Sequence, residues 1–137
     1  LEFRRVLFRS YRGTDKYLEI PEVPLSDFFK QTDQFLDNHS DAKVILQTDQ
    51  LQTREAFIER YGTRLRFSNS LPVTSGKEAI HNIPSLVSDR NSFSMKLLAM
   101  TIALSNPNLL LTNTGNVGFF MALQRFAVGR PTIQIGQ

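Results

Sequence analysis

Short β-rich apolar runs alternate with longer stretches of helical periodicity, and this alternation constrains the fold more than any other feature of the chain. Strands that are joined through helices pair in parallel, because a crossover of that length returns the chain to the edge where the previous strand began. The predicted strands are residues 6–12, 43–47, 64–68, 108–112 and 132–135, and the predicted helices are residues 24–38, 53–61, 93–104 and 116–127.

These elements predict one α/β domain, a Rossmann-like parallel sheet of about five strands with helices on both faces. The chain has 137 residues, of which 41% are hydrophobic, and this is enough for a single core. We expect the strand order 3-2-1-4-5, in which the winding reverses between the first and fourth strands. Ligands of such folds bind outside the carboxyl ends of the strands at that reversal, which directs attention to residues 12–14 and 112–116.

The connections between the elements carry further expectations. Residues 69–90 form a long polar loop, and loops of that length in a compact domain are usually functional or disordered. Asn91 or Ser92 is predicted to cap the helix that follows the loop. Gly62 and Gly129 are predicted to end the second and fourth helices.

Residues 1–10 read Leu-Glu-Phe-Arg-Arg-Val-Leu-Phe-Arg-Ser, and their back-translation resembles one frame of a short-read sequencing adapter. Because the match stops at Tyr11, we interpret residues 1–10 as adapter-derived and residues 11–137 as a domain truncated at its N-terminus. The alternative is a genuine basic N-terminal arm. These ten residues contain three arginines and one glutamate, so they account for +2 of the formal net charge of +3.

The composition that remains argues against several classes of partner. No cluster of lysine and arginine is interleaved with aromatic residues, so a nucleic-acid partner is not expected. Cysteine is absent, and His39 and His81 have no carboxylate at metal-ligand spacing, so no metal site is expected. No apolar run approaches the roughly 20 residues of a membrane span, so none is expected in this chain.

A compact motif, Tyr-Arg-Gly-Thr-Asp-Lys at residues 11–16, follows the first predicted strand. The guanidinium of Arg12 matches phosphate oxygens in a bidentate way, and Gly13 lets the backbone turn tightly beside them. When a nucleoside-diphosphate sugar reacts, charge builds up on the leaving diphosphate, and a fixed guanidinium can stabilise that charge. The alternative is a surface arginine paired with Asp15.

A second candidate turn, Thr-Asn-Thr-Gly-Asn-Val at residues 112–117, ends the fourth predicted strand and opens a helix. The free N–H groups of a helix N-terminus attract phosphate, so Thr114, Gly115 and Asn116 are candidate ligands of a diphosphate. The alternative is an ordinary capped turn, because threonine and asparagine are also good caps.

Four more charged residues have both a functional and an ordinary interpretation. Asp49 follows the second strand, where it could bind a ribose or a base edge, or cap the next helix. Glu19 and Glu22 flank Pro21, and a carboxylate there could act as a general base on an acceptor hydroxyl or be a solvated charge. Lys16 could hold such a carboxylate or a sugar hydroxyl, or be solvated.

In their order along the chain these motifs resemble the C-terminal, donor-binding half of a GT-B fucosyltransferase of the α-1,6-fucosyltransferase and nodulation-fucosyltransferase superfamily. That family carries the pattern His-x-Arg-(Arg/Gly)-Thr-Asp-Lys, which residues 12–16 match from its arginine onward. A Val-Ile-Leu-x-Thr-Asp strand end at residues 44–49, a His-Asn loop at residues 81–82, and a strand leading to a Thr-rich turn follow in the family's order. The resemblance extends from Tyr11 to about Val128.

The resemblance implies an inverting transfer of fucose from GDP-fucose to a glycan hydroxyl, with no metal and no cofactor. The residues that it implies in the donor site are Arg12 on the β-phosphate, Gly13, Asp15 and Lys16 around it, Asp49 as the essential acidic residue, and Thr114, Gly115 and Asn116 at the diphosphate. Arg12, Lys16 and, as the proposed base, Glu19 are the implied catalytic residues. The glycan acceptor would bind a domain that is missing here, so this chain would be inactive alone.

The sequence also departs from the family pattern. Ser10 stands where the family has its histidine, residues 96–101 lack the carboxylate that the family uses for guanine, and Thr114-Gly115-Asn116 replaces a Ser-Ser pair. Two rival interpretations therefore stay open: a non-catalytic nucleotide-sugar or glycan-binding module derived from such an enzyme, and an α/β domain in which residues 12–16 match by coincidence. The compartment is open too, and would be the cytoplasm in a bacterium.

Overall fold

A computed structural model describes residues 6–11, 23–105, 108–113 and 116–135 of the chain. Its strands are β1 (Val6–Tyr11), β2 (Lys43–Thr48), β3 (Leu65–Phe67), β4 (Leu109–Asn113) and β5 (Thr132–Ile135). Its α-helices are α1 (Leu25–Asn38), α2 (Leu51–Tyr61), α3 (Arg90–Leu104) and α4 (Asn116–Phe126), with short 3₁₀ turns at Gly62–Arg64 and Ile80–Asn82.

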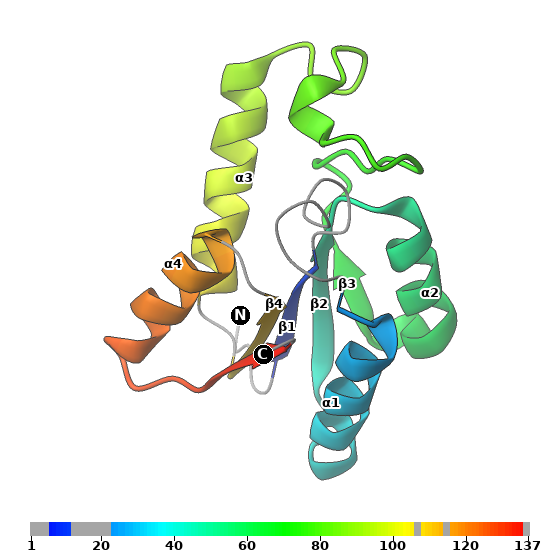
Figure 1. Cartoon of the computed structure of the whole chain (residues 1–137). Coiled ribbons are helices and arrows are strands. Elements are labelled where there is room, and N and C mark those ends of the chain that lie inside the picture. Colours follow the sequence, from blue (N-terminus) through cyan, green and yellow to red (C-terminus); the bar gives the residue numbers. More distant parts are fainter. Residues whose placement is uncertain (1–5, 12–22, 106–107, 114–115, 136–137) are drawn as a thin grey trace.

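The strands pair in parallel in the order β3-β2-β1-β4-β5, with β1 at the centre (Figure 1). Val6 pairs with Lys43 of β2, and Leu7 pairs with Leu109 of β4. Residues 6–10, interpreted above as adapter-derived, therefore form the central strand together with Tyr11. The predicted α/β class is confirmed, and the strand order agrees with the predicted one. The winding reverses between β1 and β4, so the carboxyl ends of these neighbouring strands lie at the same edge of the sheet.

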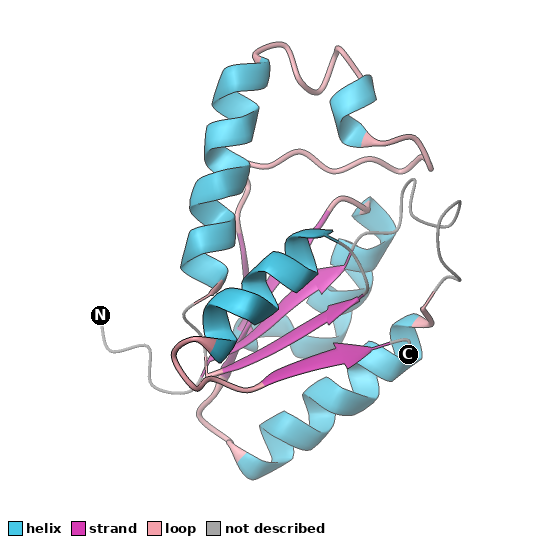
Figure 2. Ribbon diagram, turned by 60° about the vertical axis from the view of Figure 1, so that its left-hand side comes forward, coloured by secondary structure: helices cyan, strands magenta, loops and turns pink. Residues whose placement is uncertain are grey.

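Helices cover both faces of the sheet (Figures 1 and 2), and a layer of apolar side chains lies between the sheet and the helices on each face. Adjacent residues of a strand point to opposite faces, and accordingly Val44 and Leu46 of β2 join one layer while Ile45 packs in the other. The first layer contains residues of α1 and α2, and the second contains Leu104 of α3 and Met121 of α4. The helices therefore enclose the strands from both sides, as expected for a parallel sheet.

Helix α1 is held on the sheet by buried residues four positions apart, Phe28, Thr32 and Leu36. This spacing places them on one face of the helix, and the hydroxyl of Thr32 donates to the carbonyl oxygen of Phe28 at 2.8 Å. Aromatic rings then join α1 to α2: the ring centroids of Phe29 and Phe57 lie 5.1 Å apart. Such pairs stabilise a fold by about 0.5 to 1.5 kcal/mol beyond the area that they bury.

The beginning of α3 differs from the prediction. The helix begins at Arg90, and its cap is Asp89, whose carboxylate oxygen accepts the backbone N–H groups of Asn91 and Ser92 at 3.0 and 3.1 Å. Asn91 and Ser92 are therefore inside the first turn, and the prediction that one of them is the cap is wrong. Aspartate caps a helix as well as asparagine or serine does, so the sequence offers three candidate caps within four residues, Asp89, Asn91 and Ser92.

The other helix ends agree better with the sequence. Gly62 follows α2 with φ of +47°, and Gly129 follows α4 with φ of +68°, a backbone region that side chains other than glycine rarely adopt. Helix α2 begins at Leu51, two residues before the predicted start, and Gln50 rather than Asp49 occupies its cap position. Asp49 is thus left at the end of the strand.

The long connection between β3 and α3, residues 68–89, is attached to the carboxyl end of β2. The N–H of Thr74 donates to the carbonyl oxygen of Asp49 at 2.9 Å, and the N–H of Leu51 donates to the carbonyl oxygen of Thr74 at 3.0 Å. Leu71 and Ile80 of this connection are buried. The predicted loop therefore folds over the edge of the sheet. Within the described part of the chain, no helix has the length and apolar character needed to cross a membrane.

Candidate functional site

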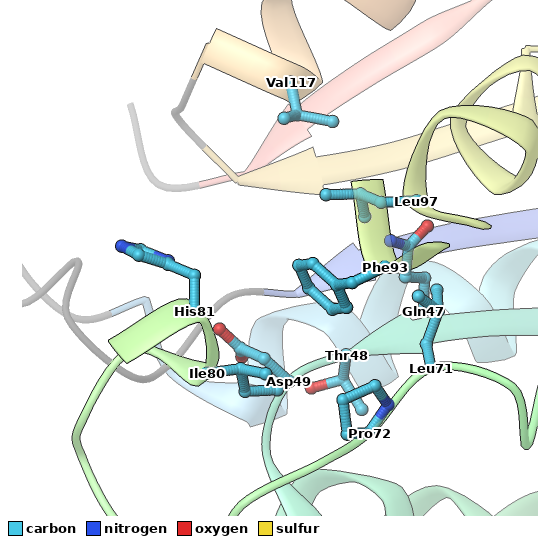
Figure 3. A pocket seen from close by; sticks show the side chains of 10 residues that line it. All are labelled: Gln47, Thr48, Asp49, Leu71, Pro72, Ile80, His81, Phe93, Leu97 and Val117. Atoms are coloured by element: carbon cyan, nitrogen blue, oxygen red, sulfur yellow. The ribbon is translucent and has the colours of Figure 1, made fainter. Parts of the chain in front are cut away.

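A cavity of about 130 Å³ lies at the carboxyl end of β2 (Figure 3). Four separate parts of the chain contribute to it: the end of β2, the 68–89 connection, the first half of α3 and the first turn of α4. Its lining residues are Gln47, Thr48, Asp49, Leu71, Pro72, Ile80, His81, Phe93, Leu97 and Val117. The cavity is therefore at the edge of the sheet where parallel α/β folds bind their ligands.

The polar side of the cavity comes from three consecutive residues, Gln47, Thr48 and Asp49. The hydroxyl oxygen of Thr48 accepts the N–H of Gln50 at 3.1 Å, which fixes the turn between β2 and α2. The backbone of Asp49 is held from the other side by Thr74. Figure 3 shows the carboxylate of Asp49 on the side of the cavity where His81 lies. This fixed backbone presents an amide, a hydroxyl and a carboxylate in a row, suited to recognise hydroxyl or N–H groups.

The opposite side is apolar. Phe93 and Leu97 lie one helical turn apart on α3 and both face the cavity, where the ring of Phe93 occupies the middle of Figure 3. Buried Leu71 and Ile80 supply the wall from the 68–89 connection. Val117 completes the lining from the first turn of α4. An aromatic ring beside aliphatic side chains offers a flat apolar surface on which a planar ring or a sugar face can pack.

An arginine supports this wall from behind. The Nη2 group of Arg54 donates a long hydrogen bond of 3.5 Å to the carbonyl oxygen of Leu71, and its guanidinium carbon lies 4.9 Å from the ring centroid of Phe67. Burial lowers the pKa of Arg54 below its ordinary value. Arg54 therefore links α2 and β3 to the loop that bears Leu71.

Of the predicted site residues, the structure brings Asp49 to the cavity. Asn116 is the first residue of α4, but its side chain lies outside the described residues, as do the remaining predicted positions. Those positions are Arg12, Gly13, Asp15, Lys16, Glu19, Thr114 and Gly115. The structure consequently leaves the role of each of them a prediction.

The strand register nevertheless constrains where two of these segments leave the sheet. Tyr11, the last residue of β1, pairs with Thr48, which lines the cavity. On the other side of β1, Ser10 pairs with Thr112 near the end of β4. Both connections therefore leave the sheet at the edge that bears the cavity. Helix α4, which begins three residues after the last residue of β4, contributes Val117 to the lining.

Sequence reasoning did not identify most of the lining. The sequence predicts Gln47, Phe93 and Leu97 only as parts of a strand and a helix and His81 only as part of a loop, whereas all four line the cavity. Their convergence depends on the path of the 68–89 connection, for which the sequence has no local signal. The position of Gln47 at the carboxyl end of a buried parallel strand was one available indication, and the length of the 69–90 loop was another.

The described residues contain no group of three or more histidine, cysteine, aspartate or glutamate side chains arranged to hold a metal ion. The polar groups of the cavity are thus an amide, a hydroxyl, one carboxylate and one imidazole, spread along its rim. This set fits the recognition of an organic ligand through hydrogen bonds.

Comparison with known proteins adds no relative to this picture: no protein-family model matches the chain, and no curated protein or solved structure matches it either.

Proposed function

We propose that this domain binds a nucleotide sugar at the carboxyl edge of its sheet, as the Rossmann-like donor-binding half of a GT-B glycosyltransferase. The observation that carries the proposal is the register of Tyr11 with Thr48. It means that the Arg-Gly-Thr-Asp-Lys motif begins one residue beyond a pair that adjoins the cavity. A phosphate-binding motif and an apolar cavity at one sheet edge suit a ligand with a charged half and a ring-shaped half.

The volume of the cavity fits one part of such a ligand. Pockets for whole drug-sized ligands occupy roughly 300 to 1,000 Å³, whereas this cavity has about 130 Å³. We assign it to the base or ribose of the nucleotide, with Phe93 and Leu97 against the ring and Asp49 accepting hydrogen bonds from its hydroxyl or N–H groups. The diphosphate then belongs to Arg12 and to the N–H groups at Thr114, Gly115 and Asn116.

In the proposed reaction an acceptor hydroxyl attacks the anomeric carbon from the side opposite the diphosphate, and the bond from this carbon to the diphosphate oxygen breaks, so the configuration inverts. Glu19 takes the proton of the hydroxyl as general base. Arg12 stabilises the charge that builds up on the leaving diphosphate, with Lys16 beside it. GDP-fucose is the proposed donor, and no metal takes part. The proposed acceptor is a hydroxyl of a glycan that another domain binds.

One feature favours the non-catalytic alternative. The wall that α3 contributes consists of Phe93 and Leu97, and residues 96–101 of that helix carry no carboxylate for a guanine edge. A module that retains the fold and binds nucleotide sugars without transferring them would tolerate that loss. The absence of that carboxylate also fits a donor whose nucleobase is not guanine.

Isothermal titration calorimetry of the 137-residue chain with GDP, GDP-fucose and UDP-glucose tests the proposal. We expect GDP-fucose to bind, Arg12→Ala to abolish binding, and Asp49→Asn to weaken it by about tenfold through the loss of one charge-assisted hydrogen bond. Asp37→Asn, an exposed carboxylate near the end of α1 and at the opposite edge of the sheet, is the matched control and leaves the affinity unchanged. A folded chain that binds none of the three ligands contradicts the proposed function.

The same titration separates the alternatives. If UDP-glucose binds more strongly than GDP-fucose, the cavity is still a nucleotide-sugar site, but GDP-fucose is not its donor. Binding that is unchanged by EDTA agrees with a metal-independent site. If GDP-fucose binds, we then add a glycan acceptor and an acceptor-binding domain in trans. Release of GDP indicates a transferase, and no release indicates a binding module.

A further inference from the structure

Helices α3 and α4 carry large apolar side chains on their outer sides as well as on the sides that face the sheet. On α4, Met121 is fully buried against the sheet, whereas Phe119 and Phe126 are 71% and 82% exposed. On α3, Leu104 is buried, whereas Met95 is 66% exposed. A helix that is apolar all round is normally covered on all sides.

The exposed residues form one stripe on each helix at helical spacing. Met95, Leu98 and Ile102 follow one another at intervals of three and four residues along α3, and Phe119, Leu123 and Phe126 do so along α4, with Phe120 beside them. The two helices contact each other on the same face of the sheet (Figures 1 and 2). These seven residues are called the outer face below.

The size of the outer face matches what a stable dimer needs. A large apolar side chain presents about 150 to 250 Å² when fully exposed, so seven that are roughly half to four-fifths exposed present on the order of 800 Å². That is about the area that one partner buries in a standard interface, and more than the few hundred Å² of the largest patch on a typical monomer.

The polar residues around the outer face indicate which kind of occupant fits. A helix that lies on a lipid surface is rich in lysine and arginine on its polar side, but α4 has one charged residue, Arg125, and this side chain is fully buried. On α3 the charged residues are Arg90 at the first position and Lys96. These two cations are few groups for a partner selected by charge, whereas the interfaces between identical chains are more apolar than other interfaces.

We propose that the outer face is a dimer interface at which two copies of this chain pair through their α3 and α4 helices. Two contacting helices from each copy then form a four-helix layer with the phenylalanines of α4 at its centre. The interface is isologous, so each copy contributes the same seven residues and no other partner is required. This pairing is independent of the nucleotide-sugar site, which lies on the inner side of α3.

Sedimentation velocity of the whole chain over a range of concentrations tests the proposal. We expect a dimer, and we expect Phe126→Lys or Leu98→Lys to weaken self-association by roughly thirtyfold or more, because each puts a charge at the centre of an apolar contact. Ile58→Lys is the matched control: it introduces the same charge at an exposed apolar residue of α2 and leaves the dimer intact. A monomeric wild-type chain, or a dimer that both variants retain, overturns the proposal.

A second measurement covers the case in which a lysine variant does not fold. The chain has no cysteine, so Gln124→Cys on α4 and Glu55→Cys on α2 each introduce a single site for a spin label. Dipolar spectroscopy should give a shorter distance between copies at position 124 than at position 55. The reverse order overturns the proposal. So does a monomer that co-sediments with phosphatidylcholine vesicles, which would assign the outer face to lipid.

Discussion

The guanidinium of Arg125 donates two hydrogen bonds to the carbonyl oxygen of Pro131, from Nη2 at 2.6 Å and from Nε at 3.2 Å. The same group also donates to the carbonyl oxygens of Ser105 and Asn108, both at 3.2 Å, and to the hydroxyl oxygen of Thr132 at 3.1 Å. One fully buried side chain of α4 thereby links the end of α3 to the chain segments that begin β4 and β5. The planar guanidinium thus donates to backbone carbonyl groups of three chain segments at once.

We expect Arg125→Lys to lower the free energy of unfolding by about 2 to 3 kcal/mol, because an ammonium cannot reach acceptors on three segments at once. Burial, and to a lesser extent the charge of Arg130, lowers the pKa of Arg125 to about 10, so the guanidinium is charged at neutral pH and all its donors are present. Urea unfolding followed by circular dichroism measures the change. Exposed Arg130→Lys is the control, and equal effects of the two substitutions would contradict this role.

The packing between α1 and α2 depends on Phe57, which is fully buried and lies 5.1 Å from the ring of Phe29 and 5.4 Å from that of Tyr61. We expect Phe57→Ala to cost about 3 to 5 kcal/mol of unfolding free energy, since it removes the ring contacts and leaves a cavity. The neighbouring Ile58→Ala, at an exposed position, should cost far less. Similar midpoints for the two variants in urea would show that the core does not rely on Phe57.

The cap of α3 gives a local prediction. Asp89→Ala removes the acceptor of the Asn91 and Ser92 N–H groups and should destabilise the helix by about 1 kcal/mol. Hydrogen exchange of these two amides should accelerate more than that of amides in α1. Asp37→Ala, an exposed aspartate in the last turn of α1, serves as the control for loss of a negative charge. Unchanged exchange at position 91 would indicate that the carboxylate of Asp89 does not cap the helix.

Substitution of Phe93 should weaken ligand binding without unfolding the protein. It is half-buried, and its ring lies in the cavity, so Phe93→Ala should weaken the binding of GDP by about tenfold while the fold persists. Phe35→Ala is the matched control: this half-buried ring stacks on His39 in α1 and should affect stability alone. Calorimetric titration paired with a thermal melt distinguishes the two effects. Equal GDP affinities of the two variants would remove Phe93 from the proposed site.

The sequence was sufficient for the class of fold, because hydrophobic periodicity and glycine stops are local signals. The predicted strand order rested on the winding common to Rossmann-like folds and not on a local signal. Gly62 is such a stop, with a backbone conformation that suits glycine. Helix starts were less accurate, since Asp89, Asn91 and Ser92 are all good caps and tertiary contacts select among them. The cavity needed information that no segment carries: Gln47, Phe93 and Val117 meet only once the sheet order and the 68–89 connection are in place.

The sequence carries a partial signal for the burial of Arg125. It is the one charged residue of α4, whose other side chains are mostly apolar, and a lone charge in such a helix indicates either a functional group or a buried, fully hydrogen-bonded one. The acceptors come from residues 105, 108 and 131, and their arrangement depends on where α3 ends and β5 begins. Only the three-dimensional structure distinguishes the two cases.

The attachment of Thr74 to the end of β2 has a consequence for how this chain can diversify. Its two backbone hydrogen bonds, to Asp49 and from Leu51, divide the long connection into two parts that are anchored separately. Residues 75–78 just beyond this anchor are exposed, and exposed loop tips generally tolerate insertion or deletion. An insertion there would lengthen the chain on the His81 side of the anchor and leave the segment that bears Leu71 attached to the end of β2.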